Sequence, residues 1–272
     1  MKFSEIKHKI KNLGNFKSLK EIKKAGLRIV RNTKTSDYWL IEEEFLKPVI
    51  KSPRECKTIL IKPEDLKYKV LMVHKSKEEL KGKKVLDYIE WGEKQGFHKR
   101  PTCKSRKWWW GLEPQKLPMI ILFMFEDERK FSCLNNYAYV DAAIYTIYPA
   151  EFKMLTFLIS MVFALFKELL ARPPEGLGAL QMKIYDYENL PAMVIDDKYD
   201  DILDCKPKSI FTELGFDPNK SIREQEPKPL PDRKALDDIV FDALGLTEEE
   251  RKEVYWAVGE LVQNRLRKAK SV

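Results

Sequence analysis

A basic and aromatic segment near the middle of the chain is best equipped for chemistry. Between His98 and Leu112 lie six basic residues, counting His98, and three consecutive tryptophans, Trp108 to Trp110. Lysine and arginine bind phosphate oxygens, and arginine can also read the edge of a guanine. Tryptophan can stack on an unpaired base, but it also buries a large apolar area. We therefore expect at least one of the tryptophans to point inward and the basic side chains to point outward.

Two shorter groups of residues could bind the same kind of ligand. The first lies in a stretch that we interpret as strand, loop and strand, where basic and hydroxyl side chains can hold a backbone phosphate. It comprises Arg28, Arg31, Lys34, Thr35 and Ser36. The second is Lys51-Ser52-Pro53-Arg54, which proline keeps out of the helical region so that it presents two cations. An ordinary polar hairpin loop and a simple surface turn are the alternative interpretations.

The charge of the chain is distributed unevenly. Its 272 residues carry a net charge of +8. Residues 1–110 contain 29 Lys and Arg against 14 Asp and Glu, whereas residues 111–272 contain 21 against 28. A strongly basic first part favours polyanions or acidic partners, and a solvated lysine-rich surface is the alternative.

Several enzyme classes lack their signatures here. The sequence contains no phosphate-binding loop of the type G-x-x-x-x-G-K-[ST], no H-E-x-x-H and no G-x-S-x-G. Its four cysteines and three histidines are too scattered for a zinc site of ordinary spacing. We therefore predict no catalytic, cofactor-binding or metal-binding residue in this chain. The longest apolar run, residues 154–166, is too short to span a bilayer. No secretory signal is recognised, so the expected location is the cytoplasm.

Hydrophobic patterning predicts the elements that position these residues. Strands are expected within 28–41 and at 57–61, 67–73, 119–125, 137–148 and 181–187, and helices at 76–92, 149–170, 232–244 and 247–268. Ser76 and Glu79 form a candidate capping box. The fold class is α+β, with a twisted mixed sheet, a buried core helix and a C-terminal helical tail. We expect a recognition domain over 1–206, an extended proline-rich linker over 207–231 and a helical hairpin over 232–272.

Four strings of residues make the sequence similar to a known family. They lie at 47–54, 96–109, 178–191 and 232–255. Together they resemble the C-terminal part of large adenine-specific N6 DNA methyltransferases of fused type II and related restriction–modification systems. The resemblance extends over 28–272. One departure is that the family commonly has Thr-Gly in its first recognition loop, where this chain has Thr35-Ser36.

The resemblance implies a target-recognition domain similar to those of Taq-type methyltransferases and type I specificity subunits. Such a domain holds double-stranded DNA against a separate methylase domain or subunit, which binds S-adenosylmethionine and flips out the adenine. Phosphate contacts would fall to Lys34, Lys51 and Lys104, and base-edge or groove contacts to Arg54, Arg100 and Arg106. The full set of predicted DNA-binding residues is Arg31, Lys34, Thr35, Lys51, Arg54, Arg100, Lys104, Arg106, Lys107 and Trp108.

Two other functions compete with this interpretation. The tryptophans could stack the bases of single-stranded RNA. Alternatively, the acidic run at Asp196, Asp197, Asp200, Asp201 and Asp204 could hold Mg²⁺ for a nuclease, although it also reads as an exposed loop. Competition between single-stranded RNA and duplex DNA separates the first alternative from DNA recognition.

Overall fold

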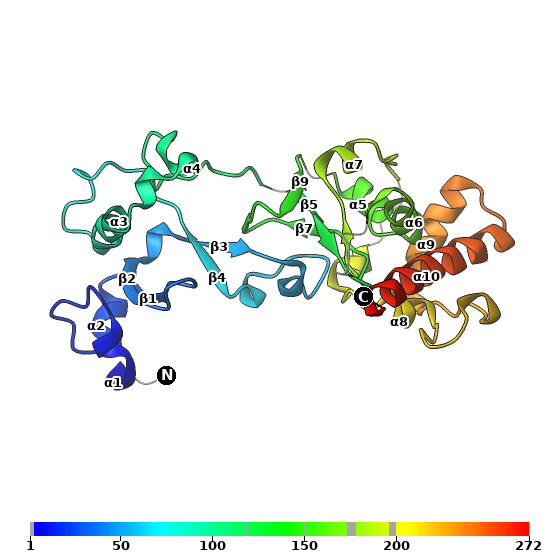
Figure 1. The fold of residues 1–272 in the computed structure, drawn as a ribbon, viewed down its shortest axis with the longest axis horizontal. Helices are drawn as coiled ribbons and strands as arrows, with labels where there is room; N and C mark the ends of the chain where they lie inside the picture. The colour runs from blue at the N-terminus through cyan, green and yellow to red at the C-terminus, as the bar shows by residue number, and fades with distance from the viewer. Residues whose placement is uncertain (1–2, 118, 150, 173–177, 196–199, 272) are drawn as a thin grey trace. The chain divides into compact units, whose positions relative to one another are not determined.

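The computed structural model describes residues 3–117, 119–149, 151–172, 178–195 and 200–271. Helices alternate with small sheets, and the α+β class predicted from the sequence is confirmed (Figure 1). Among the described residues the strands form four sheets of two or three strands, not one larger sheet, with the orders β1-β2, β10-β6, β4-β3-β8 and β7-β5-β9. Contacts divide the chain into unit 1, residues 1–48 and 69–115, and unit 2, residues 49–68 and 116–272.

The elements of unit 1 are α1 (Phe3–Ile6), α2 (Leu19–Lys24), β1 (Leu27–Arg31), β2 (Tyr38–Glu42), α3 (Lys84–Lys94) and α4 (Pro101–Lys104). The strands β3 (Leu46–Ile50) and β4 (Tyr68–Leu71) cross the boundaries between the units. Unit 2 contains β5 (Met119–Phe123), β6 (Phe125–Glu126), β7 (Cys133–Asn135), β8 (Tyr139–Val140), β9 (Ile144–Ile147), α5 (Phe152–Leu158), α6 (Met161–Leu170), β10 (Leu180–Gln181), α7 (Ile184–Glu188), α8 (Ile210–Leu214), α9 (Pro231–Leu244) and α10 (Glu248–Lys270).

Unit 1 is built on the antiparallel hairpin of β1 and β2, which pairs Val30 with Trp39. Side chains alternate between the two faces of the hairpin because successive residues of a strand point in opposite directions. Leu40 packs on one face with Ile10 and Ile22 of the N-terminal segment, residues 3–24. Trp39 packs on the other face with Ile89 of α3. The N-terminal segment and α3 therefore cover opposite faces of the hairpin (Figure 1).

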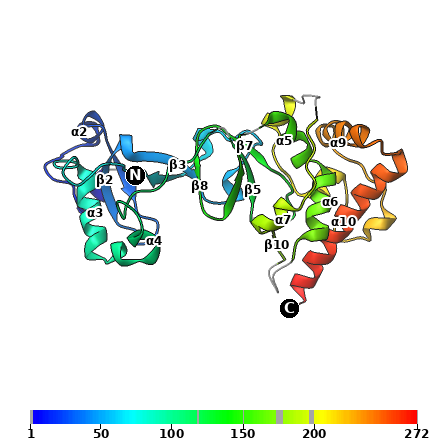
Figure 2. The same ribbon diagram turned by 90° about the horizontal axis from the view of Figure 1, so that it is seen from above.

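Unit 2 has one large core in which the C-terminal helices take part. Phe123 of β5, Phe163 of α6, Val240 of α9 and Val258 of α10 belong to a single cluster of buried residues. Helices α6, α9 and α10 pack against each other (Figure 2). The helical hairpin that we expected at 232–272 therefore has no core separate from that of the preceding residues. No helix among the described residues is both long and apolar enough to cross a membrane.

The proline-rich stretch before α9 is a packed arm. Its Ile222 is 2% exposed and belongs to the core cluster of unit 2. The backbone N–H groups of Lys228 and Leu230 donate to the carbonyls of Leu214 and Glu213, at 2.9 and 2.8 Å. An extended linker at 207–231 was expected, but the stretch contains helix α8, and these contacts fix part of it against unit 2.

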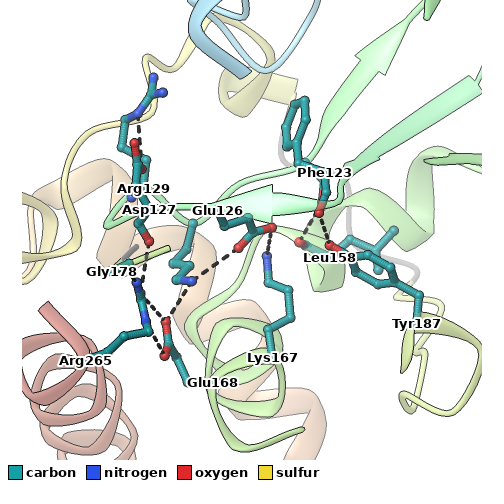
Figure 3. Close-up of polar contacts among 12 residues, drawn as sticks. Phe123, Glu126, Asp127, Arg129, Leu158, Lys167, Glu168, Gly178, Tyr187 and Arg265 are labelled. Carbon is teal, nitrogen blue, oxygen red and sulfur yellow. Dashed lines mark hydrogen bonds and ion pairs between the residues drawn. The ribbon is translucent and has the colours of Figure 1, made fainter. Parts of the chain in front are cut away.

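A buried ionic network joins three parts of unit 2 (Figure 3). Lys167 of α6 lies 2.7 Å from Glu126 of β6, and Lys130 lies 3.3 Å from Glu126 and 2.7 Å from Glu168. Arg265 of α10 lies 2.8 Å from Glu168. Burial favours a raised pKa for Glu168, but Lys130 and Arg265 outweigh it and lower that pKa. Each buried charge thus has an opposite partner, as burial of a charge requires.

Five predicted elements differ from the structure. The strand expected at 137–148 is two strands, β8 and β9, which belong to different sheets. Residues 57–61 form no strand beyond an isolated bridge from Leu60 to Leu134. The helix expected at 76–92 begins at Lys84, because the reciprocal bonds of Ser76 and Glu79 close a turn instead of capping a helix. Ser160 interrupts the long helix and caps α6. The strand expected at 181–187 ends at Gln181, and α7 follows.

Candidate nucleic-acid interface

The loop between β1 and β2, residues 32–37, is organised by one side chain. Asn32 Oδ1 accepts hydrogen bonds from the backbone N–H groups of Lys34 and Thr35, at 2.8 and 3.0 Å. The backbone N–H of Asn32 donates to Asp37 O at 2.8 Å, and that of Ser36 donates to Asn32 O at 2.9 Å. Such side-chain bonds to the backbone define a turn without regular secondary structure. Lys34 and Thr35 are left exposed at its tip.

Ser36 adopts a left-handed conformation with φ of 64°. Glycine populates this region most readily, and the family to which the sequence is similar commonly has Gly at this place. The Ser36 hydroxyl accepts a hydrogen bond from Arg31 Nη2 at 2.7 Å. The loop thus keeps a turn that glycine would favour. Arg31 is exposed but is partly engaged in holding that turn.

Loop 32–37 is joined to an aromatic ladder, which we define as Tyr88, Trp91 and Phe97. Asn32 Nδ2 donates to the Tyr88 hydroxyl at 2.7 Å. The Tyr88 and Trp91 rings stack with centroids 5.3 Å apart, and Phe97 meets Trp91 edge-on at 5.6 Å. The guanidinium of Arg100 lies 4.4 Å from the centre of the Phe97 ring. A continuous series of contacts therefore leads from the loop to Arg100.

Beyond Phe97 the chain forms the basic segment, residues 97–107. It contains a short 3₁₀ helix, Phe97–Lys99, and then α4. The side chains of Arg100, Lys104, Arg106 and Lys107 are exposed. Lys107 Nζ lies 4.5 Å from the centre of the half-buried Trp108 ring. Cations stacked on aromatic rings in this way are held in place while they remain accessible to a ligand.

The tryptophans divide as the sequence predicts. Trp109 and Trp110 pack against the core that contains Trp39 and Ile89. The indole Nε1 of Trp109 donates to Glu93 at 3.0 Å, and Lys77 pairs with the same carboxylate at 2.6 Å. Burial favours a raised pKa for Glu93, but these two donors outweigh it and lower that pKa. The inward tryptophans thus anchor the basic segment, and their rings are committed to packing.

The exposed cations of unit 1 have a favourable charge environment for a polyanion. Within the described residues, Lys34, Arg100, Lys104, Arg106 and Lys107 are paired with no carboxylate. Unit 1 contains 24 Lys and Arg against 12 Asp and Glu, a net charge of +12, whereas unit 2 contains 26 against 30, a net charge of −4. The positive charge of the chain is therefore concentrated in the unit that carries these side chains.

Two predicted contact residues lie in the other unit. Lys51 precedes the 3₁₀ helix Pro53–Glu55 near the start of unit 2, Arg54 lies within this helix, and both are exposed. The backbone N–H of Lys51 donates to Glu55 at 2.7 Å, and its Nζ lies 5.1 Å from the centre of the Tyr68 ring. The structure thus connects loop 32–37 to the basic segment through contacts within unit 1, whereas Lys51 and Arg54 belong to unit 2.

Sequence reasoning missed the residues that connect the two groups. Asn32 reads as an ordinary turn former, and Tyr88 and Trp91 read as positions of an amphipathic helix. Their spacing of three residues places them on one helix face, which is the only signal that could have found the stacking.

Most of the acidic run lies outside the side chains that the structure describes. Asp196 and Asp197 lie outside the described residues, as do the side chains of Asp200 and Asp201, and Asp204 pairs with Lys62 at 2.7 Å. The described part of the chain contains no group of three or more His, Cys, Asp or Glu suited to a metal ion.

Comparisons with known proteins point to restriction–modification enzymes. The family model described as "Type II methyltransferase M.Eco57I, C-terminal domain" matches residues 29–191. The solved structure of the type IIG restriction endonuclease BpuSI is similar, with a TM-score of 0.52 and 12% sequence identity. The similar region covers 84% of this chain and 27% of the BpuSI chain, so the chain spans about a quarter of that length. At this identity the likeness concerns the fold alone. A search of the curated proteins gave no match.

Proposed function

Because the chain belongs to the family of the C-terminal domain of the type II methyltransferase M.Eco57I, we propose that it recognises double-stranded DNA in a sequence-specific manner. The observation that carries the proposal is the joining of loop 32–37 to the basic segment through Asn32 and the aromatic ladder. This arrangement presents exposed, unpaired cations from two distant stretches of one unit.

We assign the contacts by side-chain chemistry. Lys34, Lys104 and Lys107 would bind backbone phosphates, since an ammonium group acts as a point charge. Arg100 and Arg106 would reach base edges, because a guanidinium can donate two parallel hydrogen bonds to guanine. Trp108 and Thr35 would support these contacts, and Arg31 would mainly hold the loop. Lys51 and Arg54 would add phosphate and groove contacts from unit 2.

The catalytic step would belong to a partner. Adenine methylation requires a domain or subunit that binds S-adenosylmethionine and accommodates the flipped base. In the proposed arrangement, the chain holds the target sequence, and the partner supplies the cofactor site and the chemistry. The chain would then act as the specificity part of a restriction–modification enzyme, either fused to the methylase or as a separate specificity subunit.

Binding to labelled nucleic acids tests this proposal. The full chain is titrated into duplex DNA and into single-stranded RNA at several salt concentrations. We expect preference for duplex DNA and a linear fall of log K with log salt concentration. Replacing Lys34, Arg100 and Arg106 together by alanine should weaken duplex binding, and loss of the Lys34 phosphate contact should lower the magnitude of that slope by about one.

Two results would count against the proposal. Preference for single-stranded RNA would favour a stacking interface, although the inward packing of Trp109 and Trp110 leaves only Trp108 for that role. Duplex binding that the triple variant does not change would mean that the interface lies elsewhere on the chain. The charge-matched control replaces Lys206, Lys208 and Lys228, three exposed lysines of unit 2.

A further inference from the structure

Residues 10 and 11 of the N-terminal segment run alongside β2, the strand that follows loop 32–37. Ile10 forms a parallel bridge with Tyr38, and the Lys11 backbone N–H donates to Tyr38 O at 2.9 Å. Lys11 Nζ lies 3.4 Å from Asp37 in the loop. The 3₁₀ helix Lys7–Lys9 directly precedes these contacts. Because the bridge is parallel, this helix lies toward the end of β2 that adjoins the loop.

A buried amide fixes this segment in place. Asn12 is 8% exposed, and its Oδ1 accepts a hydrogen bond from the Leu40 backbone N–H at 2.7 Å. Its Nδ2 donates to the backbone carbonyls of Leu40 and Lys84, at 3.0 and 3.1 Å. A buried amide with its hydrogen bonds satisfied specifies a single arrangement. Residues 10–12 are thus tied to β2, and Asn12 also to α3.

The charges of this segment favour an anion. Residues 1–20 contain six lysines and one carboxylate, Glu5. Lys7 and Lys9 are exposed, and in the described part of the chain neither is paired with a carboxylate. Lys11 compensates the charge of Asp37, so that this carboxylate does not oppose an approaching phosphate. Two accessible cations therefore directly precede the residues that contact the end of loop 32–37.

We propose that Lys7 and Lys9 bind backbone phosphates of duplex DNA beside loop 32–37, extending the interface without reading its sequence. This inference rests on the proposed function of the chain. Lysine suits this role, because its ammonium group binds phosphate as a point charge. The segment lies before residue 29, where the match to the family begins.

The test compares two duplexes, one that carries the preferred target sequence and one of scrambled sequence. Replacing Lys7 and Lys9 by alanine in the full chain should weaken binding to both duplexes by the same factor, roughly tenfold for two phosphate contacts near 0.1 M salt. The slope of log K against log salt concentration should fall in magnitude by about 1 to 2. The ratio of the two affinities should stay unchanged.

The control replaces Lys20 and Lys24, two exposed lysines of α2. This helix leads into Leu27, at the end of β1 away from loop 32–37. The same change of charge should therefore leave the salt slope close to that of the wild type. Thermal unfolding of both double variants checks that the fold is intact.

Three outcomes overturn the inference. If Lys7→Ala/Lys9→Ala behaves like the control while the Lys34, Arg100 and Arg106 variant loses affinity, the inference fails and the proposed function stands. If the affinity ratio of the two duplexes changes, these lysines contribute to sequence reading. If the wild-type chain binds neither duplex, the inference and the proposed function fail together.

Discussion

Asn32 and Tyr88, 56 residues apart, are joined by a hydrogen bond of 2.7 Å from the Asn32 side-chain amide to the Tyr88 hydroxyl. The same Asn32 side chain holds the turn of loop 32–37, and the Tyr88 ring begins the ladder that ends at Arg100. This one bond therefore relates the position of Lys34 to that of the basic segment. In the proposed interface, it would set which spacing of phosphates and bases the two groups can contact together.

Replacing Tyr88 by phenylalanine should reduce DNA affinity although Tyr88 contributes no cation. The variant keeps the stacking of this ring on Trp91, while the side-chain amide of Asn32 loses the hydroxyl that accepts its hydrogen bond. A hydrogen bond of this kind contributes about 0.5–1.5 kcal/mol, so we expect a loss of roughly twofold to tenfold in affinity for duplex DNA. The backbone amides of Lys34 and Thr35 should also exchange faster with solvent, because the turn becomes less fixed.

The matched control for that variant is Tyr137→Phe, since Tyr137 is an exposed tyrosine of unit 2. The control should change neither the affinity for duplex DNA nor the exchange rate of the Lys34 and Thr35 amides. In addition, Lys34→Ala should reduce the affinity less in the Tyr88→Phe background than in the wild type, because a displaced lysine contributes less to binding. Strict additivity of the two changes would contradict a positioning role for Tyr88.

Removal of the Arg265 side chain should strongly destabilise unit 2. Its guanidinium pairs with Glu168 and donates to the carbonyls of Gly178 and Asp127. Arg265→Ala leaves the Glu168 carboxylate buried with one cation fewer, which costs about 3–5 kcal/mol of the free energy of unfolding. Urea unfolding measures this loss. Arg267→Ala, at an exposed position of the same helix, should cost less than about 0.5 kcal/mol.

Gly92→Ala should destabilise unit 1, although alanine is the better helix former by about 1 kcal/mol. A Cβ added at Gly92 of α3 would lie 2.5 Å from the Trp109 ring, which is held by its bond to Glu93. Displacing the ring costs about 1–3 kcal/mol, so the clash outweighs the gain in propensity. Tryptophan fluorescence during denaturation follows this change, and a stabilised Gly92→Ala variant would show that Trp109 is not fixed there.

The stability of unit 2 should depend on pH through Asp237. One carboxylate oxygen accepts the Met161 backbone N–H at 2.9 Å, and burial raises the pKa of Asp237 from 3.8 to about 6. Between these values the folded state holds more protons than the unfolded state, so the contribution of Asp237 falls as pH rises. The fall is on the order of 3 kcal/mol.

Comparison with Asp237→Asn isolates this dependence, because asparagine keeps an acceptor for Met161 and does not titrate. The free energy of unfolding of the wild type minus that of the variant should decrease from pH 4 to pH 6 and level off above pH 7. A difference that is constant across this range would mean that Asp237 titrates with its ordinary pKa.

Local patterns predicted those elements whose signals are themselves local. The alternation of residues 28–41 indicated β1 and β2, and the patterning of 247–268 indicated α10, which begins with a capping box of Thr247 and Glu250. The same type of signal was wrong at Ser76 and Glu79, where reciprocal bonds close a turn because the apolar helix face begins only at Val85. Alternation was also wrong after Gln181, where Asp186 accepts the Lys183 N–H and starts α7.

The features that the sequence could not predict depend on contacts between distant residues. The joining of Asn32 to Tyr88 requires α3 to pack on the hairpin, which no spacing reveals. The division into two units likewise depends on the chain returning at 69–115 to the first 48 residues. Both basic stretches of the candidate interface were predicted from the sequence, but the contacts of Asn32 with the aromatic ladder that join them were not.

Selection from a pool of randomised duplex DNA, with sequencing of the bound fraction, tests sequence-specific recognition most directly. The wild-type chain should enrich a short motif, and the variant lacking the Arg100 and Arg106 side chains should lose that enrichment while retaining weak, salt-sensitive binding. Binding without any enriched motif, or a motif that both chains select equally, would contradict the account.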